Sequence, residues 1–61
     1  MYDVNDTVIC IEPSGDLEYG REYVVGRIEG DFVYVYVDGV LDGGFFLQRF
    51  ALAPKKPGFF D

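Results

Sequence analysis

The chain has 61 residues, of which 49% are hydrophobic and 18% aromatic, and eleven acidic against five basic residues give a net charge of −6 at pH 7. A chain this short forms one domain and buries only about 60% of its unfolded surface, so it needs nearly all its large apolar residues for a core. The apolar content disfavours intrinsic disorder, and the missing basic footprint disfavours binding to duplex nucleic acid.

The cysteine count and the first residues indicate a compartment. Cys10 is the only cysteine, which excludes an intramolecular disulfide and therefore a disulfide-held extracellular scaffold. Neither a leader pattern nor a run of roughly 18 apolar residues is present, so we expect a cytoplasmic protein with no membrane partner. The negative charge favours solubility or an acidic surface that meets a basic partner, of which DNA mimicry is the extreme form.

The first predicted strand is the short β-branched run over residues 7–11, which follows a polar lead-in. Alternation buries either Val8 and Cys10 or Ile9 and Ile11. An unactivated thiol packs as a small hydrophobe, so we expect a packing role for Cys10 rather than a chemical one.

A loop and a second strand follow. Residues 13–20 are rich in Gly and acids, which predicts a long surface loop with Leu17 or Tyr19 tucked under it. Residues 22–29 predict a strand in which strict alternation would bury Arg27. We therefore expect a bulge or bend at Gly26 that resets the register.

Residues 32–37 are the predicted central strand, with a neighbour on each side. The run lies between Gly30-Asp31 and Asp38-Gly39, two dipeptides that suit tight hairpin turns. Alternation separates two faces. The valines, which we expect in the core, are Val33, Val35 and Val37, and the aromatic residues on the opposite face are Phe32, Tyr34 and Tyr36.

The rest of the chain predicts short elements. A brief strand at residues 40–41 is interrupted by 42–44, a strand resumes at 45–46, a single helical turn covers 47–50, and a last strand covers 51–53. This gives one domain over residues 1–53 and an extended tail over 54–61. The predicted core consists of Val8, Cys10, Tyr23, Val25, Ile28, Val33, Val35, Phe46, Phe50 and Leu52.

Four segments together resemble a group of short bacteriophage and prophage proteins with Src-homology-three-like barrels, most of which carry no assigned function. The segments are 8–11, 20–25, 30–35 and 43–50, within a resemblance that covers residues 7–53. The most specific parts are Gly-Gly-Phe-Phe-x-x-Arg-Phe and Gly-x-x-Tyr-x-Val. The resemblance implies a small five-stranded antiparallel barrel and a phage origin, and it supplies no active site.

The chain is poorly equipped for chemistry. It has no histidine, and Ser14 lies in a turn, so a nucleophile with a neighbouring base is missing. Clustered zinc ligands are also missing, and Asp38 and Asp42 do not have the spacing of a calcium loop. So small a domain leaves little room for a cleft of about 300 Å³. We therefore expect neither an enzyme nor a cofactor or metal site, and we expect Arg49 to pair with Asp31, Asp38 or Asp42.

Two candidate contact sites remain, the aromatic stripe Phe32, Tyr34 and Tyr36 and the tail residues Phe59 and Phe60. Tyrosine is enriched at protein interfaces, so the stripe favours a protein partner, and the phage resemblance implies a host factor. Simple surface tolerance, or a tail folded over the stripe, would account for the same residues. Two other functions are a homo-oligomeric structural protein and single-strand nucleic-acid binding, although the latter normally needs a positive groove.

Overall fold

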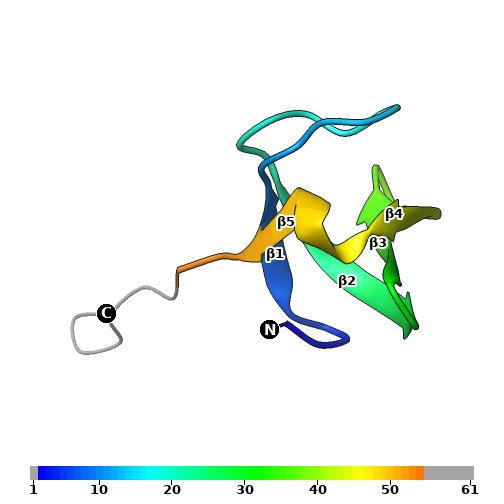
Figure 1. Ribbon diagram of the computed structural model, residues 1–61. Helices are drawn as coiled ribbons and strands as arrows, with labels where there is room; N and C mark the ends of the chain where they lie inside the picture. The colour runs from blue at the N-terminus through cyan, green and yellow to red at the C-terminus, as the bar shows by residue number, and fades with distance from the viewer. Residues whose placement is uncertain (1, 55–61) are drawn as a thin grey trace.

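The fold is a five-stranded antiparallel sheet with one helical turn, as seen in a computed structural model that describes residues 2–54 (Figure 1). The strands are ordered β4-β3-β2-β1-β5. The elements are β1 (Thr7–Cys10), β2 (Glu22–Glu29), β3 (Phe32–Val37), β4 (Val40–Phe46), the 3-10 helix η1 (Leu47–Arg49) and β5 (Phe50–Leu52). This confirms an all-β domain with a helical turn before its last strand. Within the described part, no helix has the length and apolarity of a membrane span.

The sheet is open, so the prediction of a closed barrel is wrong. β4 and β5 lie at opposite ends of the strand order, and no pairing among the described strands joins them. All three residues of β5 pair with β1, and the chain between β4 and β5 is used for η1.

Strand β2 connects the two sides of the molecule (Figure 1). Its first half pairs with β1 and its second half with β3, and the register shifts between Val25 and Arg27. This confirms the predicted bulge at Gly26. The extra residue keeps Val25 buried and places Ile28 against the core, while Arg27 faces solvent.

Both hairpin turns around β3 form as predicted. Asp38 and Gly39 have φ angles of 50° and 84°, the pattern of a type I′ turn. In the other turn Gly30 alone has a positive φ, 58°, as expected where glycine takes the first central position of a type II′ turn. Strand β4 is continuous rather than interrupted at residues 42–44, because the register shift opposite Val33 and Val35 absorbs the glycines.

The core lies on the valine face of β3. The buried apolar residues are Tyr2, Val8, Cys10, Leu17, Tyr23, Val25, Val33, Val35, Phe50 and Ala53. The predicted Val8/Cys10 face of β1 is therefore confirmed, whereas Ile28 is only partly buried. Of the two loop residues left open, Leu17 is buried and Tyr19 is exposed.

Two predicted core residues, Phe46 and Leu52, are wrong because they are 47% and 48% exposed. After the register shift in β4, Phe45 pairs with Val33 and packs on the core, which leaves Phe46 on the outer face. Leu52 pairs with Val8, but it ends the short edge strand β5 and is only half covered. These two residues are among several large hydrophobic residues that the described fold leaves exposed.

Helix η1 is held at both ends by distant parts of the chain. The Tyr2 hydroxyl donates to the Leu47 carbonyl at 2.7 Å, and the Leu47 amide donates to the Asp31 carbonyl at 3.1 Å. The predicted aspartate partners of Arg49 are wrong. Arg49 instead donates to the Glu12 carbonyl at 3.4 Å, with the Glu12 carboxylate 4.0 Å away, because the segment after β1 runs beside η1.

Candidate functional site

The outer face of β3 carries the predicted aromatic stripe. Phe32 is 43% exposed and Tyr36 is 46% exposed, while Tyr34 between them is half-buried. The neighbouring valines Val33 and Val35 are fully buried on the inner face. Alternation along one strand therefore fixes both the core and the exposed rings.

Strand β4 widens this stripe into a surface. Phe46 lies opposite Phe32, with ring centroids 5.2 Å apart, and Leu41 lies opposite Tyr36. We call the set Phe32, Tyr34, Tyr36, Leu41 and Phe46 the outer aromatic surface. Residues directly opposite in an antiparallel pair share a face, so these side chains form one continuous patch across two strands.

Glycines form the floor of the outer aromatic surface. A Cβ atom at Gly26 of β2 would lie 2.5 Å from Leu41 Cδ1 and 2.8 Å from Tyr36 Cε2. A Cβ atom at Gly44 would lie 3.0 Å from Phe32 Cβ. The side chains lie directly on the backbone of their neighbours because these positions have no side chain of their own.

Two arginines border this surface in the described part of the chain, and Arg49 is one of them, with its guanidinium 6.0 Å from the centroid of the Phe46 ring. The Arg27 guanidinium lies 5.5 Å from the centroid of the Tyr34 ring and also forms an ion pair with Glu29. Such a cation–π contact at an exposed site is worth about 0.5–1 kcal/mol. Tyr34 also lies directly against Gly43 of β4, and it is less exposed than Phe32 and Tyr36.

A separate apolar groove lies beside η1, adjoining the outer aromatic surface at Phe46. It encloses about 700 Å³, open to solvent, and its lining consists of Tyr2, Asp31, Phe46, Leu47, Gln48, Phe50, Ala51 and Leu52. The prediction that so small a domain leaves little room for a cleft of about 300 Å³ is therefore wrong. The groove exists because η1 and the edge strand β5 are left uncovered on one side by the open sheet.

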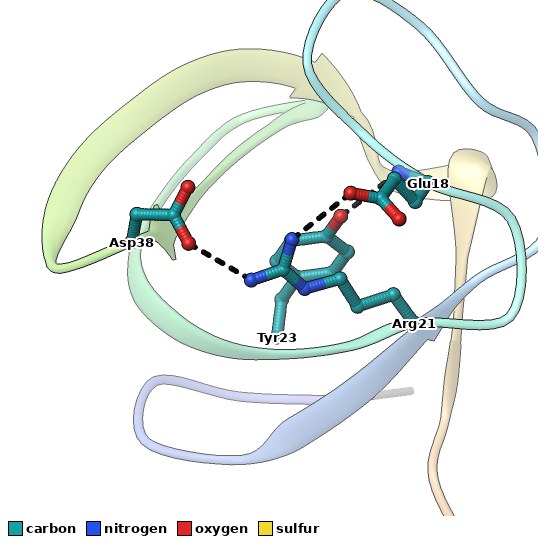
Figure 2. Close-up of polar contacts among 4 residues, drawn as sticks. All are labelled: Glu18, Arg21, Tyr23 and Asp38. Carbon is teal, nitrogen blue, oxygen red and sulfur yellow. Dashed lines mark hydrogen bonds and ion pairs between the residues drawn. The ribbon is translucent and has the colours of Figure 1, made fainter.

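A third feature is the polar cluster around Arg21, which joins the long loop to the β3–β4 turn. Figure 2 shows the Arg21 guanidinium between the carboxylates of Glu18, at 3.1 Å, and Asp38, at 3.0 Å. The Tyr23 ring lies beneath it at 5.4 Å, and the Glu18 amide donates to the Tyr23 hydroxyl at 2.8 Å. The hydrogen bond to Asp38 raises the pKa of Arg21, so the guanidinium stays charged.

The groove beside this cluster is acidic. Asp16, Glu18, Asp38 and Asp42 line it together with Arg21. Asp38 and Asp42 thus line the same groove, but within residues 2–54 no three acidic or thiol groups are close enough together to hold a metal ion. Exposed ion pairs of this kind contribute little to stability. We interpret the cluster as a contact that positions the long loop against the β3–β4 hairpin.

The remaining predicted residues fall on neither surface. Cys10 is buried in the core as a free thiol, in line with the packing role predicted for it. The candidate tail residues Phe59 and Phe60 lie outside the described residues.

Sequence reasoning missed Leu41 and Phe46 as members of the outer aromatic surface. The two-residue turn at Asp38-Gly39 pairs Val37 with Val40, and this register alone places Leu41 opposite Tyr36. The position of Leu41 could therefore have been predicted by counting residues outward from the turn along both strands. Phe46 could not, because its face depends on the register shift at the glycines.

Comparison with known proteins gives no relative: no protein-family model matches the chain, and neither a curated protein nor a solved structure matches it. The function proposed below therefore rests on the geometry of the chain itself.

Proposed function

We propose that this protein is a non-catalytic binding module whose outer aromatic surface contacts another protein. The observation that carries the proposal is the continuous exposure of Phe32, Tyr36, Leu41 and Phe46 across β3 and β4. So short a chain needs its large apolar residues for the core, yet Phe46 lies exposed beside other apolar side chains. An exposed apolar patch of this kind often marks a contact site.

The chemistry of the patch suits a protein partner. Aromatic side chains bury a large area and lose little rotamer entropy on binding, and interface centres are poor in charge. Here the two arginines that border the patch in the described chain, Arg27 and Arg49, lie next to the carboxylates of Glu29 and Glu12. This pairing argues against single-strand nucleic acid as the partner, because stacking on rings is normally coupled to a positive groove.

The likeness to small phage barrels extends the proposal. The order β4-β3-β2-β1-β5 and a 3-10 turn before the last strand support a Src-homology-three-like arrangement, here with an open sheet. On this basis we propose a phage-encoded accessory protein that acts in the cytoplasm and modulates a host protein. A homo-oligomeric structural protein would use the same surface.

Loss of the rings tests the proposal. A Tyr34→Ala, Tyr36→Ala double variant is compared with wild type and with Tyr19→Ala, a control that removes a 74% exposed ring from the long loop. We expect a host protein captured by tagged wild type and by the control to be lost from the double variant, whose circular dichroism shows that it remains folded. Equal capture by all three proteins would contradict the proposal.

Concentration separates a foreign partner from a second copy. Sedimentation of the untagged protein over a range of concentrations should show a monomer throughout. Self-association that the double variant abolishes would assign the outer aromatic surface to a homo-oligomer instead.

A further inference from the structure

Strand β4 forms a long open edge of the sheet. It lies at one end of the strand order and pairs with β3 alone. Among the described residues, no backbone hydrogen bond beyond that pairing involves residues 40–46. The opposite edge strand, β5, has three residues, whereas β4 has seven. Unpaired N–H and C=O groups along an edge of this length are a template for a further strand.

The turn at Asp38-Gly39 determines which backbone groups of β4 point away from β3. In a two-residue turn, the residue after the turn donates to the carbonyl of the residue before it, so the Val40 amide is directed at β3. Hydrogen-bonding direction alternates along an antiparallel strand, so the N–H and C=O groups of Leu41 point to the open edge. The next outward amide, that of Gly43, donates to the Asp42 carboxylate at 2.9 Å.

The two faces beside this edge differ in chemistry. Leu41 is 41% exposed and belongs to the outer aromatic surface. Val40 and Asp42 alternate with Leu41, and on the opposite face they line the acidic groove together with Asp38. Directly opposed residues of neighbouring strands share a face. A residue that an added strand places opposite Leu41 therefore meets apolar side chains, and one placed opposite Asp42 meets carboxylates.

We propose that the partner of the outer aromatic surface is an extended segment of another protein, which adds to β4 as a further strand and alternates apolar with basic residues. The apolar side chains pack on the outer aromatic surface, and the cations face the acidic groove. This inference rests on the proposed function and adds the conformation and the sequence pattern of the partner. A net charge of −6 disfavours a second copy of the chain at the same edge.

Synthetic peptides test this pattern on the full-length protein. The probe is a seven-residue peptide in which lysine and valine alternate. One control has glutamate in place of lysine, and another has the composition of the probe with its valines in one block. In NMR titrations we expect the probe to shift the Leu41 amide resonance and slow its hydrogen exchange several-fold, an effect that salt weakens and neither control reproduces. No effect on β4 amides, or equal effects of all three peptides, would overturn the proposal.

Substitutions at Leu41 separate strand pairing from side-chain contact. Leu41→Pro removes the outward N–H and Leu41→Ala keeps it, while both remove the leucine side chain; proline is tolerated on an edge strand where the N–H faces solvent. We expect the proline variant to bind the probe about ten-fold more weakly than the alanine variant, as for the loss of one hydrogen bond. Equal affinities would overturn the proposal.

A backbone ester keeps this test decisive if Leu41→Pro does not fold. So short a chain is accessible to chemical synthesis, and an ester in place of the Leu41 amide removes the N–H but retains the side chain. We expect the folded ester protein to bind the probe about ten-fold more weakly than wild type. An affinity equal to that of wild type would overturn the proposal.

Two further results distinguish a failure of this inference from a failure of the proposed function. Capture of a host protein that the Tyr34→Ala, Tyr36→Ala variant loses, but that Leu41→Pro and Leu41→Ala retain equally, would keep the surface and overturn the added strand. Slow exchange of the Leu41 amide without any peptide would overturn it as well, because the edge would already be covered. The cover would be a second copy if dilution restores fast exchange, and the chain itself if it does not.

Discussion

Tyr2, near the beginning of the chain, contacts helix η1, which lies near the end of the described fold. Its ring is buried and its hydroxyl donates to the carbonyl of Leu47, 45 positions away. The sequence predicted a polar lead-in here, because a lone tyrosine among acids has no periodic apolar pattern around it. Burial of single residues outside strands depends on tertiary contacts that no local pattern encodes.

Removing the Tyr2 hydroxyl should destabilise the fold. Tyr2→Phe keeps the ring but leaves the Leu47 carbonyl without its donor, and we expect the free energy of unfolding to fall by about 1 kcal/mol. Urea denaturation measures the change, with Tyr19→Phe as a control at an exposed ring. Equal losses in the two variants would show that the bond to Leu47 contributes nothing specific.

The same hydroxyl predicts a dependence on alkaline pH. Burial raises the pKa of Tyr2 above its ordinary value of 10.0. The stability that this shift contributes is complete below the pKa of the unfolded chain and is lost as pH rises through the higher pKa of the folded state. The difference in unfolding free energy between wild type and Tyr2→Phe should therefore stay constant below pH 10.0 and shrink as the pH rises above it. A difference that stays constant would contradict this role.

At the scale of elements, the strands and turns followed from local chemistry. Alternation in residues 32–37 correctly separated buried valines from outward rings, and the unfavourable burial of Arg27 correctly required a bulge at Gly26. The glycines of β4 were misread as a break in the strand. A glycine can end a strand or be absorbed as an irregularity, and only the pairing with β3 decides between the two.

Alanine substitutions at Gly43 and Gly26 should lower the free energy of unfolding by different amounts. At Gly43 an added Cβ would lie 2.8 Å from the Val33 carbonyl oxygen and 2.9 Å from Tyr34 Cα, so the backbone itself has to move. At Gly26 it would meet only side-chain atoms of Leu41 and Tyr36, both partly exposed and able to shift. We expect Gly43→Ala to cost about 1–3 kcal/mol and Gly26→Ala to cost less. Thermal denaturation of the two variants compares them, and the reverse order would contradict the packing described for β4.

At the scale of the whole molecule, the all-β class was predictable and the closure of the sheet was not. Whether β4 meets β5 depends on how many residues η1 uses and how short β5 is, and both are details of one or two residues. The apolar groove beside η1 is a consequence of that open edge. The exposure of Phe46 and Leu52 likewise followed from the assembled sheet rather than from their hydrophobicity.

Photo-crosslinking from single positions tests the central claim, that the valine face of β3 forms the core while the outer aromatic surface meets a partner. A photoreactive phenylalanine analogue replaces Tyr36 in one protein and Tyr19 in another, both exposed positions. In host lysate, the account predicts a discrete crosslinked product from position 36, absent from position 19 and lost when untagged wild type competes. Crosslinking from position 19 alone, or no product from position 36, would contradict it.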